Sequence, residues 1–142
     1  MQSQPSKEHP FYLLSILLII SLSLVMACSG KSSDAIKQIS VSDLKTLLDK
    51  DSTLKLVDVR TVTEYNTVRV PHIKARIDFQ EIADLIDTTA FPKDQPVYLI
   101  CRTGRRSLVA AKELKEAGYQ QPINVKGGTM AWEQSGYPVI KH

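Results

Sequence analysis

The chain has 142 residues, 43% of them hydrophobic and 23% charged, which is the size and composition of one globular domain with a single core. Its formal charge of +3 favours small anions but is too low for the dense basic surface of a nucleic-acid-binding protein. The sequence contains neither a Cys and His spacing typical of a zinc site nor a phosphate-binding P-loop pattern.

The N-terminal part has the layout of a signal peptide. Residues 11–30, FYLLSILLIISLSLVMACSG, carry no charge, and Lys7 lies just upstream; a basic start, an apolar stretch and small residues at its end are typical of export. The letters VMAC at 25–28 resemble a bacterial lipobox, whose cysteine is lipidated and becomes the new N-terminus after cleavage. The sequence therefore predicts a signal peptide over 1–28 that ends at a lipidated Cys28.

Two other interpretations of this segment stay open. The uncharged run is near the length of a bilayer crossing and could be an uncleaved anchor, or cleavage could occur without lipid and leave Cys28 as an ordinary residue. Met26 is larger than the residue usual in a lipobox, but the lipoprotein is the favoured interpretation. All three export the domain, so we expect it to face the bacterial periplasm, and the small polar residues 29–37 predict a short tether.

Beyond the tether, predicted helices and strands alternate along the chain. The residues at 40–43, SVSD, form a capping-box pattern that opens the first helix, and Gly118 is a natural end for the third. The predicted strands lie within 54–60, 72–79, 95–101 and 123–125. The predicted helices begin at or near Val41, Gln80, Ser107 and Thr129. Because the strands are apolar throughout rather than alternating, the pattern predicts an α/β domain with a parallel sheet covered by helices on both faces.

The segment YLICRTGRRS, residues 98–107, is the strongest candidate for a functional site. Cys101 ends a buried strand and directly precedes a helix, and in a parallel sheet the loops at these strand ends form the ligand site. Backbone N–H groups of the loop and of the helix N-terminus should face the sulfur, lower the pKa of the thiol and favour the thiolate. Arg102, Arg105 and Arg106 would add positive charge and attract an anionic substrate.

A structural interpretation of Cys101 competes with this one. A free cysteine is most often a small buried hydrophobic residue, and Cys101 could merely end its strand. A hydrophobic strand end requires neither three arginines nor a glycine, and both occur in the next five positions. We therefore favour a reactive thiol.

The segment 38–139 resembles a rhodanese domain, the thiosulfate sulfurtransferase fold, and we expect that domain over 38–142. Four motifs occur in the family's order: LVDVR at 56–60 with Glu64-Tyr65, His72-Ile73, CRTGRRS at 101–107, and AGY…V.GG…AW…GYPV at 117–139. The turn after His72 departs from the family, because Lys-Ala-Arg at 74–76 stands where Pro-Gly-Ala is usual.

The resemblance implies sulfur transfer through a persulfide on Cys101. A small anionic sulfur donor such as thiosulfate would bind at Arg102, Thr103, Gly104, Arg105 and Arg106, and cyanide or a thiol would accept the sulfur. Of these, Arg102 and Arg105 are expected to orient the donor, whereas Arg106 could instead turn inward and brace the loop. The mechanism implies no metal and no organic cofactor, and we expect a monomer whose membrane contact is its N-terminal lipid or anchor.

Two alternatives to this enzyme remain. A rhodanese-like module could carry sulfur or bind a partner without turnover, although an intact loop with its cysteine favours the enzyme. Related phosphatases and arsenate reductases use a loop one residue longer than the six residues from Cys101 to Arg106, and Ser107 occupies the place of their arginine. The resemblance also implies structural roles for Asp58, Arg60 and His72.

Overall fold

The computed structural model describes residues 35–141. The predicted signal peptide and the predicted lipidation site at Cys28 lie outside the described residues, as does most of the predicted tether. Among residues 35–141, no helix combines the length and the apolar character needed to cross a bilayer.

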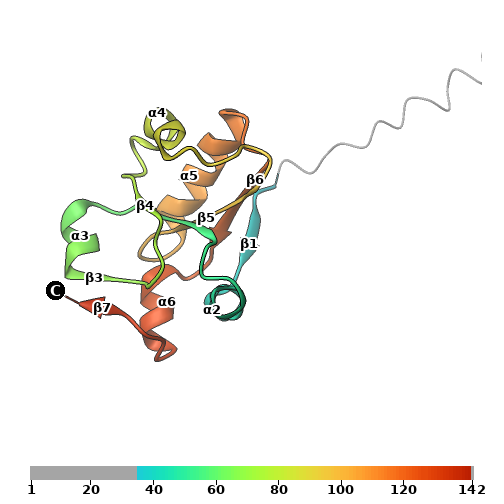
Figure 1. Cartoon of the computed structure of the whole chain (residues 1–142). Coiled ribbons are helices and arrows are strands. Elements are labelled where there is room, and N and C mark those ends of the chain that lie inside the picture. Colours follow the sequence, from blue (N-terminus) through green and yellow to red (C-terminus); the bar gives the residue numbers. More distant parts are fainter. Residues whose placement is uncertain (1–34, 142) are drawn as a thin grey trace, which may run out of the picture. The chain divides into compact units, whose positions relative to one another are not determined.

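The core of the fold is a five-stranded sheet in the order β1-β6-β5-β2-β4 (Figure 1). Every neighbouring pair in it is parallel, which confirms the predicted α/β class. Its strands are β1 (Lys37–Ile39), β2 (Lys55–Asp58), β4 (Ala75–Arg76), β5 (Pro96–Ile100) and β6 (Gln121–Val125). The helices are α2 (Val41–Lys50), α3 (Val62–Thr67), α4 (Ile82–Leu85), the 3₁₀ turn η2 (Ile86–Thr89), α5 (Arg105–Glu116) and α6 (Gly128–Gln134).

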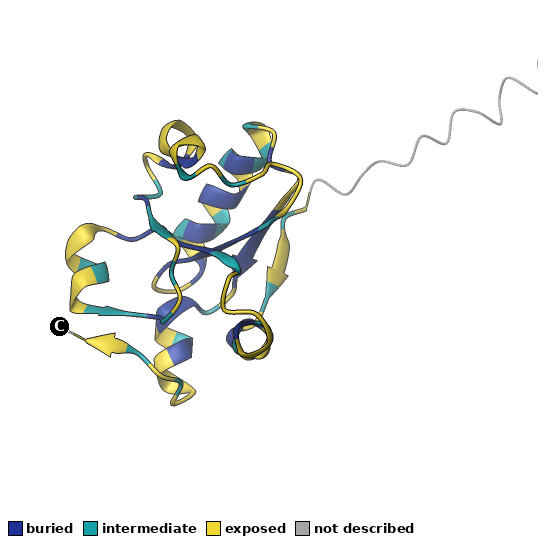
Figure 2. Cartoon of the chain, viewed as in Figure 1, coloured by how far each residue is buried: buried dark blue, intermediate teal, exposed yellow. Residues whose placement is uncertain are grey.

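Two hydrophobic clusters cover the two faces of this sheet. Side chains of β5 alternate between them, with Val97 and Leu99 in the cluster that includes α4 and α5, and Tyr98 and Ile100 in the cluster that includes α2 and α6. The central strands are therefore buried on both faces, whereas the helices keep an exposed side (Figure 2). This burial explains why the strands are continuous apolar runs in the sequence.

Local signals set the helix starts. The Ser40 side chain accepts a hydrogen bond from the Asp43 backbone N–H at 3.1 Å, and the Asp43 carboxylate accepts one from the Ser40 backbone N–H at 3.0 Å. The predicted capping box therefore opens α2. A second box, formed by Thr61 and Glu64, opens α3. It also fixes the position of the Glu64 carboxylate near the end of β2.

The structure corrects three details of the sequence prediction. β1 begins at Lys37, so the tether predicted for 29–37 ends earlier than expected. Helix α5 starts at Arg105 rather than Ser107, because Gly104 takes a φ of 91° and turns the chain directly into the helix. The two-residue strands β3 (Val68–Arg69) and β7 (Ile140–Lys141) pair antiparallel in a separate small ribbon, and strands this short leave no periodic pattern to predict.

The backbone at the His72 turn adopts an uncommon conformation. His72 lies in the left-handed region, with a φ of 64°, where non-glycine residues are uncommon. The chain then enters β4, which is only the two residues Ala75 and Arg76. The Arg76 side chain reaches back and donates a hydrogen bond to the Arg60 carbonyl at 3.2 Å.

Candidate active site

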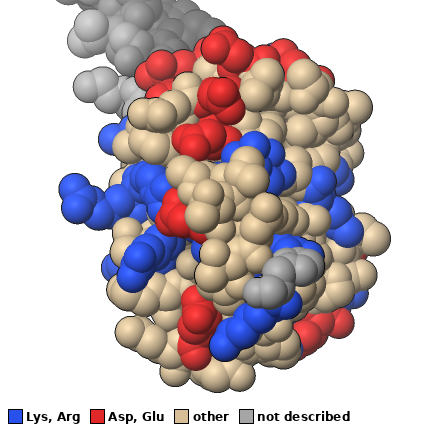
Figure 3. Space-filling model, turned by 90° about the vertical axis from the view of Figure 1, so that its left-hand side faces the viewer, with Lys and Arg blue, Asp and Glu red and all other residues tan. Residues whose placement is uncertain are grey.

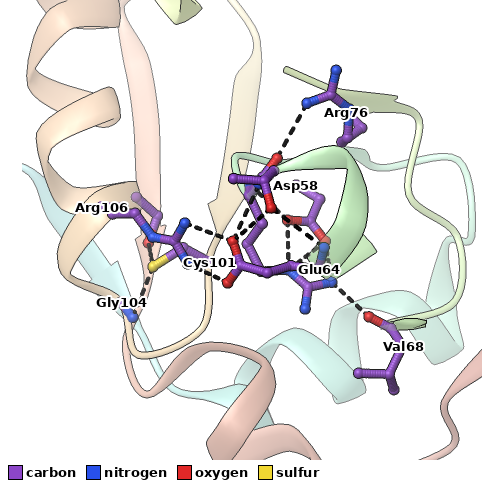
Figure 4. Close-up of polar contacts among 10 residues, drawn as sticks. Asp58, Glu64, Val68, Arg76, Cys101, Gly104 and Arg106 are labelled. Atoms are coloured by element: carbon purple, nitrogen blue, oxygen red, sulfur yellow. Dashed lines mark hydrogen bonds and ion pairs between the residues drawn. The ribbon is translucent and has the colours of Figure 1, made fainter. Parts of the chain in front are cut away.

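Cys101 follows β5 directly and is 1% exposed. The loop that follows passes beneath the first turn of α5, and the Cys101 sulfur points toward that turn (Figure 4). The Gly104 backbone N–H donates to Cys101 Sγ at 3.1 Å and the Ser107 hydroxyl lies 3.3 Å from the same atom. The sulfur is therefore enclosed by hydrogen-bond donors of its own loop and helix.

The pKa of the Cys101 thiol results from two opposing effects. Burial raises it, because a buried thiolate loses hydration; hydrogen bonds from the Ser107 side chain and from the backbone N–H groups of Ser107, Thr103 and Gly104 lower it. The hydrogen bonds outweigh burial, so the pKa lies below the ordinary value of a cysteine. The site thus favours the nucleophilic form of the thiol.

Two glycines allow the close approaches that the loop requires. A Cβ on Gly104 would lie 3.0 Å from the Gly127 backbone nitrogen, at a backbone angle that side chains rarely adopt. A Cβ on Gly128 would overlap the Cys101 carbonyl oxygen and the Arg102 carbonyl group. Both positions therefore require glycine, and the loop packs directly on the start of α6.

Helix α6 also holds the loop by hydrogen bonds. The Thr129 N–H donates to the Cys101 carbonyl at 2.8 Å, and the Met130 N–H donates to the Arg102 carbonyl at 3.0 Å. The orphan N–H groups of the helix start are thereby used to fix the backbone of the reactive cysteine. This supporting role of the Gly127-Gly128 turn is not visible in the sequence motif alone.

The three loop arginines differ in their surroundings. Arg102 and Arg105 are exposed, as is Thr103 between them. Arg106 is partly buried and donates two hydrogen bonds to the Glu64 carboxylate, at 2.8 and 2.6 Å. Its guanidinium therefore links α5 to α3 (Figure 4), the inward arrangement that the sequence left open for this arginine.

The Glu64–Arg106 pair changes the ionisation of both groups. The Arg106 hydrogen bonds, with smaller effects from the Thr61 cap, lower the pKa of Glu64 to about 2 against the opposing effect of burial. The Glu64 carboxylate in turn raises the pKa of Arg106. Both groups are fully charged at neutral pH. The Arg106 guanidinium therefore neutralises the negative charge of the Glu64 carboxylate, which lies close to the thiol.

Asp58 and Arg60 form a second, deeper ion pair at the end of β2. The residues are 0% and 3% exposed, and the Arg60 guanidinium contacts the Asp58 carboxylate at 2.6 to 3.0 Å. Arg60 also donates to the Val68 carbonyl at 2.8 Å. These buried contacts join the end of β2 to β3, the arrangement of a structural pair.

Two open hollows flank the reactive loop. One, of about 500 Å³, is lined by residues that include Glu64, Arg102 and Met130. The other, of about 400 Å³, is lined by Phe79, Thr103, Arg105, Arg106 and Val109. Each exposed loop arginine thus lies at a hollow large enough for a small anion.

The surface charge near α3 is mixed. On the face shown in Figure 3, Lys and Arg form separate groups among acidic and uncharged residues rather than one continuous basic surface. Within residues 35–141, no group of three or more His, Cys, Asp or Glu side chains is placed to hold a metal ion.

Asn124 is a member of the site that the sequence did not single out. It lies in β6, is 1% exposed, and its Oδ1 lies 2.6 Å from the Ser107 hydroxyl. Its Nδ2 donates to Gln38 of β1 at 3.0 Å. One feature of the sequence could have indicated this residue: it is the single amide within the otherwise apolar run INV, residues 123–125.

Comparison with known proteins agrees with this architecture. The rhodanese-like domain family matches residues 40–135. The putative sulfurtransferase YtwF of Bacillus subtilis is 37% identical over 103 residues, which cover 72% of this chain and 96% of YtwF. The putative sulfur carrier protein YrkF of the same organism is 31% identical over 104 residues, 73% of this chain but only 55%, about half, of YrkF.

Solved structures lead to the same fold. The crystal structure of a rhodanese-like domain protein from Staphylococcus aureus matches with a TM-score of 0.60 at 32% identity. The match covers 68% of this chain and 91% of that one. With a parallel five-stranded sheet, a loop with a buried cysteine at the carboxyl end of β5 and a family match over residues 40–135, this chain belongs to the rhodanese-like family.

Proposed function

We propose that the chain is a sulfurtransferase that moves a sulfane sulfur from thiosulfate, or a similar anionic donor, to a thiol or cyanide. The observation that carries the proposal is the Cys101 sulfur, which is enclosed by N–H and O–H donors that lower the pKa of the thiol. A buried structural cysteine has no need of such donors. The name of the relative YtwF, a putative sulfurtransferase, supports the same chemistry.

In the first half of the reaction, the Cys101 thiolate attacks the outer sulfur of thiosulfate. A new S–S bond forms, the bond between the two thiosulfate sulfurs breaks, and sulfite leaves with the electron pair. The cysteine becomes a persulfide whose negative charge lies on the outer sulfur. N–H groups of the loop, which include that of Gly104 at 3.1 Å from Sγ, stabilise the charge in the manner of an oxyanion hole.

In the second half, a nucleophile removes the outer sulfur. A thiolate or cyanide attacks it, the S–S bond to Cys101 breaks, and the Cys101 thiolate leaves with the electron pair. Cyanide yields thiocyanate and a thiol yields a new persulfide. The same donors that favour the free thiolate then make Cys101 a good leaving group, and no metal or organic cofactor enters either step.

The loop residues divide between donor binding and support. Arg102 and Arg105 are exposed at the two hollows and attract the dianionic donor, whereas Thr103 and Gly104 supply backbone N–H groups. Arg106 is occupied by Glu64 and supports the loop. The resemblance implied that all five loop residues bind the donor. In this proposal Arg106 supports the loop instead, and the other four bind the donor.

Phosphoryl transfer fits this loop less well. The six residues from Cys101 to Arg106 give a short ring of N–H groups, suited to one sulfur atom rather than to a phosphoryl group with its oxygens. Ser107, at the place where a longer loop carries its arginine, is 0% exposed and turned toward the sulfur. A phosphatase assay with a small aryl phosphate should therefore show no Cys101-dependent turnover.

A second candidate function is a sulfur carrier that holds the persulfide and passes it to one partner without turning over free thiosulfate. The name of the relative YrkF, a putative sulfur carrier protein, and the 1% exposure of Cys101 favour it. The two functions differ in one measurement. An enzyme releases thiocyanate continuously from thiosulfate and cyanide, whereas a carrier gives at most one equivalent.

The proposal includes the location of the protein. We infer from the sequence of 1–28 that the chain is exported as a periplasm-facing lipoprotein anchored through Cys28. From its resemblance to single rhodanese domains we propose that it is a monomer. Labelled palmitate supplied to a bacterium that expresses the full chain should be incorporated, and Cys28→Ser should abolish the incorporation. Retention of the label in Cys28→Ser would exclude lipidation at this cysteine.

The decisive experiment is intact-mass spectrometry of the full chain, purified in detergent, reduced and then incubated with thiosulfate. The mass should rise by one sulfur atom and return to its starting value when cyanide is added. Cys101→Ser should show no rise, whereas Cys28→Ser should behave as the parent. Folded, reduced protein that gains no sulfur would overturn thiosulfate as donor.

A further inference from the structure

Asn124 is a buried amide in a strand that is otherwise apolar. Its neighbours along β6, Ile123 and Val125, are 3% and 0% exposed, and Leu99 of β5 lies beside it in register. A buried amide destabilises the fold unless its donors and acceptor are all satisfied. Both ends of the Asn124 side chain have partners, Ser107 on one side and Gln38 on the other.

The Ser107 hydroxyl stands between two acceptors but owns one hydrogen. Its Oγ lies 2.6 Å from Asn124 Oδ1 and 3.3 Å from Cys101 Sγ, so a hydrogen bond to one excludes the other. When Cys101 is a neutral thiol, the short bond to Asn124 uses the hydrogen, and an Oγ lone pair can accept from the thiol. When the sulfur is a thiolate, it accepts only, and the hydrogen is required there.

The hydrogen bond from Ser107 to the thiolate is incompatible with the orientation that the Asn124 amide has beside the neutral thiol. With the hydrogen directed at the sulfur, Ser107 Oγ and Asn124 Oδ1 would be two oxygens 2.6 Å apart with no hydrogen between them. A half turn of the Asn124 amide places Nδ2 at that position, where it donates to Oγ. Oδ1 then faces Gln38, whose amide also has a donor and an acceptor and can turn in the same way.

Strand pairing makes this concerted turn possible. Gln38 and Asn124 are register partners in the β1–β6 pair, which holds their side chains within hydrogen-bond distance. Gln38 belongs to the edge strand and is exposed, so its amide can turn without disturbing the core. The line Gln38, Asn124, Ser107 therefore runs from solvent to the sulfur.

We propose that Asn124 is a positioning residue that switches the Ser107 hydroxyl between itself and Cys101 Sγ as the sulfur gains or loses charge, with Gln38 turning in step. No atom is transferred along the line; the thiol proton itself leaves to solvent. In the charged state, three successive donors end on the sulfur. These three side chains can therefore keep every buried polar group of the site hydrogen-bonded both when the sulfur is neutral and when it is charged.

The consequence for turnover rests on the proposed sulfur transfer. The Cys101 sulfur is charged as the attacking thiolate, becomes neutral in the persulfide, and is charged again as the leaving group. The switch would therefore operate twice in each cycle. The ionisation of Cys101 can be measured without any donor or acceptor, so failure of the switch and failure of the proposed function are distinguishable.

Charged groups around the loop stay constant in the test. They lie around the carboxyl end of the sheet and include Asp58, Arg60, Glu64, Asp78, Arg102, Arg105, Arg106 and Lys126. The first comparison changes Gln38, which is exposed and lies at the end of the line farthest from Cys101. In Gln38→Glu, the new carboxylate can only accept a hydrogen bond at neutral pH, so the Asn124 Nδ2 must donate to it and Asn124 Oδ1 keeps the hydrogen bond from Ser107. In Gln38→Lys, the new ammonium can only donate, so Asn124 Oδ1 must accept from it and Asn124 Nδ2 faces Ser107 Oγ.

The measurement is the rate of Cys101 alkylation by iodoacetamide against pH, in the full chain with Cys28→Ser so that Cys101 is the one thiol. Gln38→Glu should raise the pKa of the thiol and slow alkylation at neutral pH by about threefold, and Gln38→Lys should accelerate it by a similar factor, corresponding to about half a pKa unit each way. An unchanged pH profile in both variants would overturn the switch.

The charges introduced at position 38 could also shift the pKa of Cys101 directly through space. Removing one of the hydrogen-bonding side chains between position 38 and Cys101 separates this direct effect from the switch. Asn124→Leu removes the relay, so in that background the two Gln38 variants keep only their direct charge effect, which 0.5 M salt should suppress. Their full effect should require Asn124. Shifts as large in Asn124→Leu as in the parent would overturn the proposal; Ser107→Ala cuts the line at a second point and serves if Asn124→Leu does not fold.

Discussion

Arg106 of α5 and Glu64 of α3 join the reactive loop to the end of β2 through two hydrogen bonds, at 2.8 and 2.6 Å. The two residues are 42 positions apart in the sequence. Each is also held locally, Glu64 by the Thr61 capping box and Arg106 by the first turn of α5. The pair therefore ties α3 to the first turn of α5, the helix whose Ser107 contacts the Cys101 sulfur.

Glu64→Gln should destabilise the folded chain at neutral pH by about 1–2 kcal/mol. The full effect of a pKa near 2 would be larger, but the Glu64 side chain is 31% exposed and solvent screens the pair. Because the pKa is depressed in the folded state, the stabilisation is complete above the ordinary value of 4.5 and is lost as the pH falls toward 2.

Urea unfolding of parent and Glu64→Gln at pH 7 and at pH 2.5 measures this effect. The difference in the free energy of unfolding should be present at pH 7 and much reduced at pH 2.5. Asp49→Asn, which removes a carboxylate from the exposed Lys45–Asp49 pair, should cost well under 1 kcal/mol at either pH. An equal loss for Glu64→Gln at both pH values would exclude the ionic contribution.

The sequence was sufficient to predict the elements whose signal is local. The apolar runs of β2 and β5 and the capping box of α2 occupy the positions expected for them, and the parallel sheet follows from the lack of alternation. β1 could not be predicted in this way, because its residues Lys37 and Gln38 are polar and exposed. It forms because β6 offers a free edge, which is a tertiary property.

The site shows the same division. The Cys101 loop was predictable, since a cysteine, a glycine and three arginines at a strand end form a local pattern. The partners that complete it come from distant segments: Glu64 on α3, Gly128 on α6 and Asn124 on β6. Their roles depend on which strands are neighbours, so they required the folded structure.

Arg102→Ala and Arg105→Ala should each weaken the binding of thiosulfate. Both side chains are exposed, so each loss should raise KM by about three- to tenfold with a smaller change in kcat, and added salt should narrow the difference from the parent. Lys112→Ala removes the same charge from an exposed position further along α5 and should leave KM unchanged. A KM effect of equal size in Lys112→Ala would point to net charge rather than to the loop.

Gly128→Ala should disrupt the loop. The new Cβ would overlap the carbonyl groups of Cys101 and Arg102, so the start of α6 must move away and lose the hydrogen bonds from Thr129 and Met130. We expect a loss of about 3 kcal/mol or more in the free energy of unfolding. Gly136→Ala is the matched control, because Gly136 also has a positive φ of 71° but has open space around it.

In that control the cost is backbone strain alone, about 1 kcal/mol. Urea unfolding measures both variants, and alkylation of Cys101 by iodoacetamide reports on the loop. Gly128→Ala should also change the alkylation rate, whereas Gly136→Ala should not. Equal stability losses in the two variants would show that strain, and not the overlap with the cysteine loop, determines the effect.

Arg60→Met should be among the most destabilising single changes in the described chain. It leaves the Asp58 carboxylate 0% exposed without its main partner and removes the bond to the Val68 carbonyl. Breaking a buried ion pair from one side costs about 3–5 kcal/mol, because the remaining charge stays buried and unpaired. The double variant Asp58→Asn with Arg60→Met removes that charge and should recover part of the loss. Thermal or urea unfolding of the three proteins measures this, and a double variant less stable than Arg60→Met would show that Asp58 stabilises the fold through contacts other than the arginine.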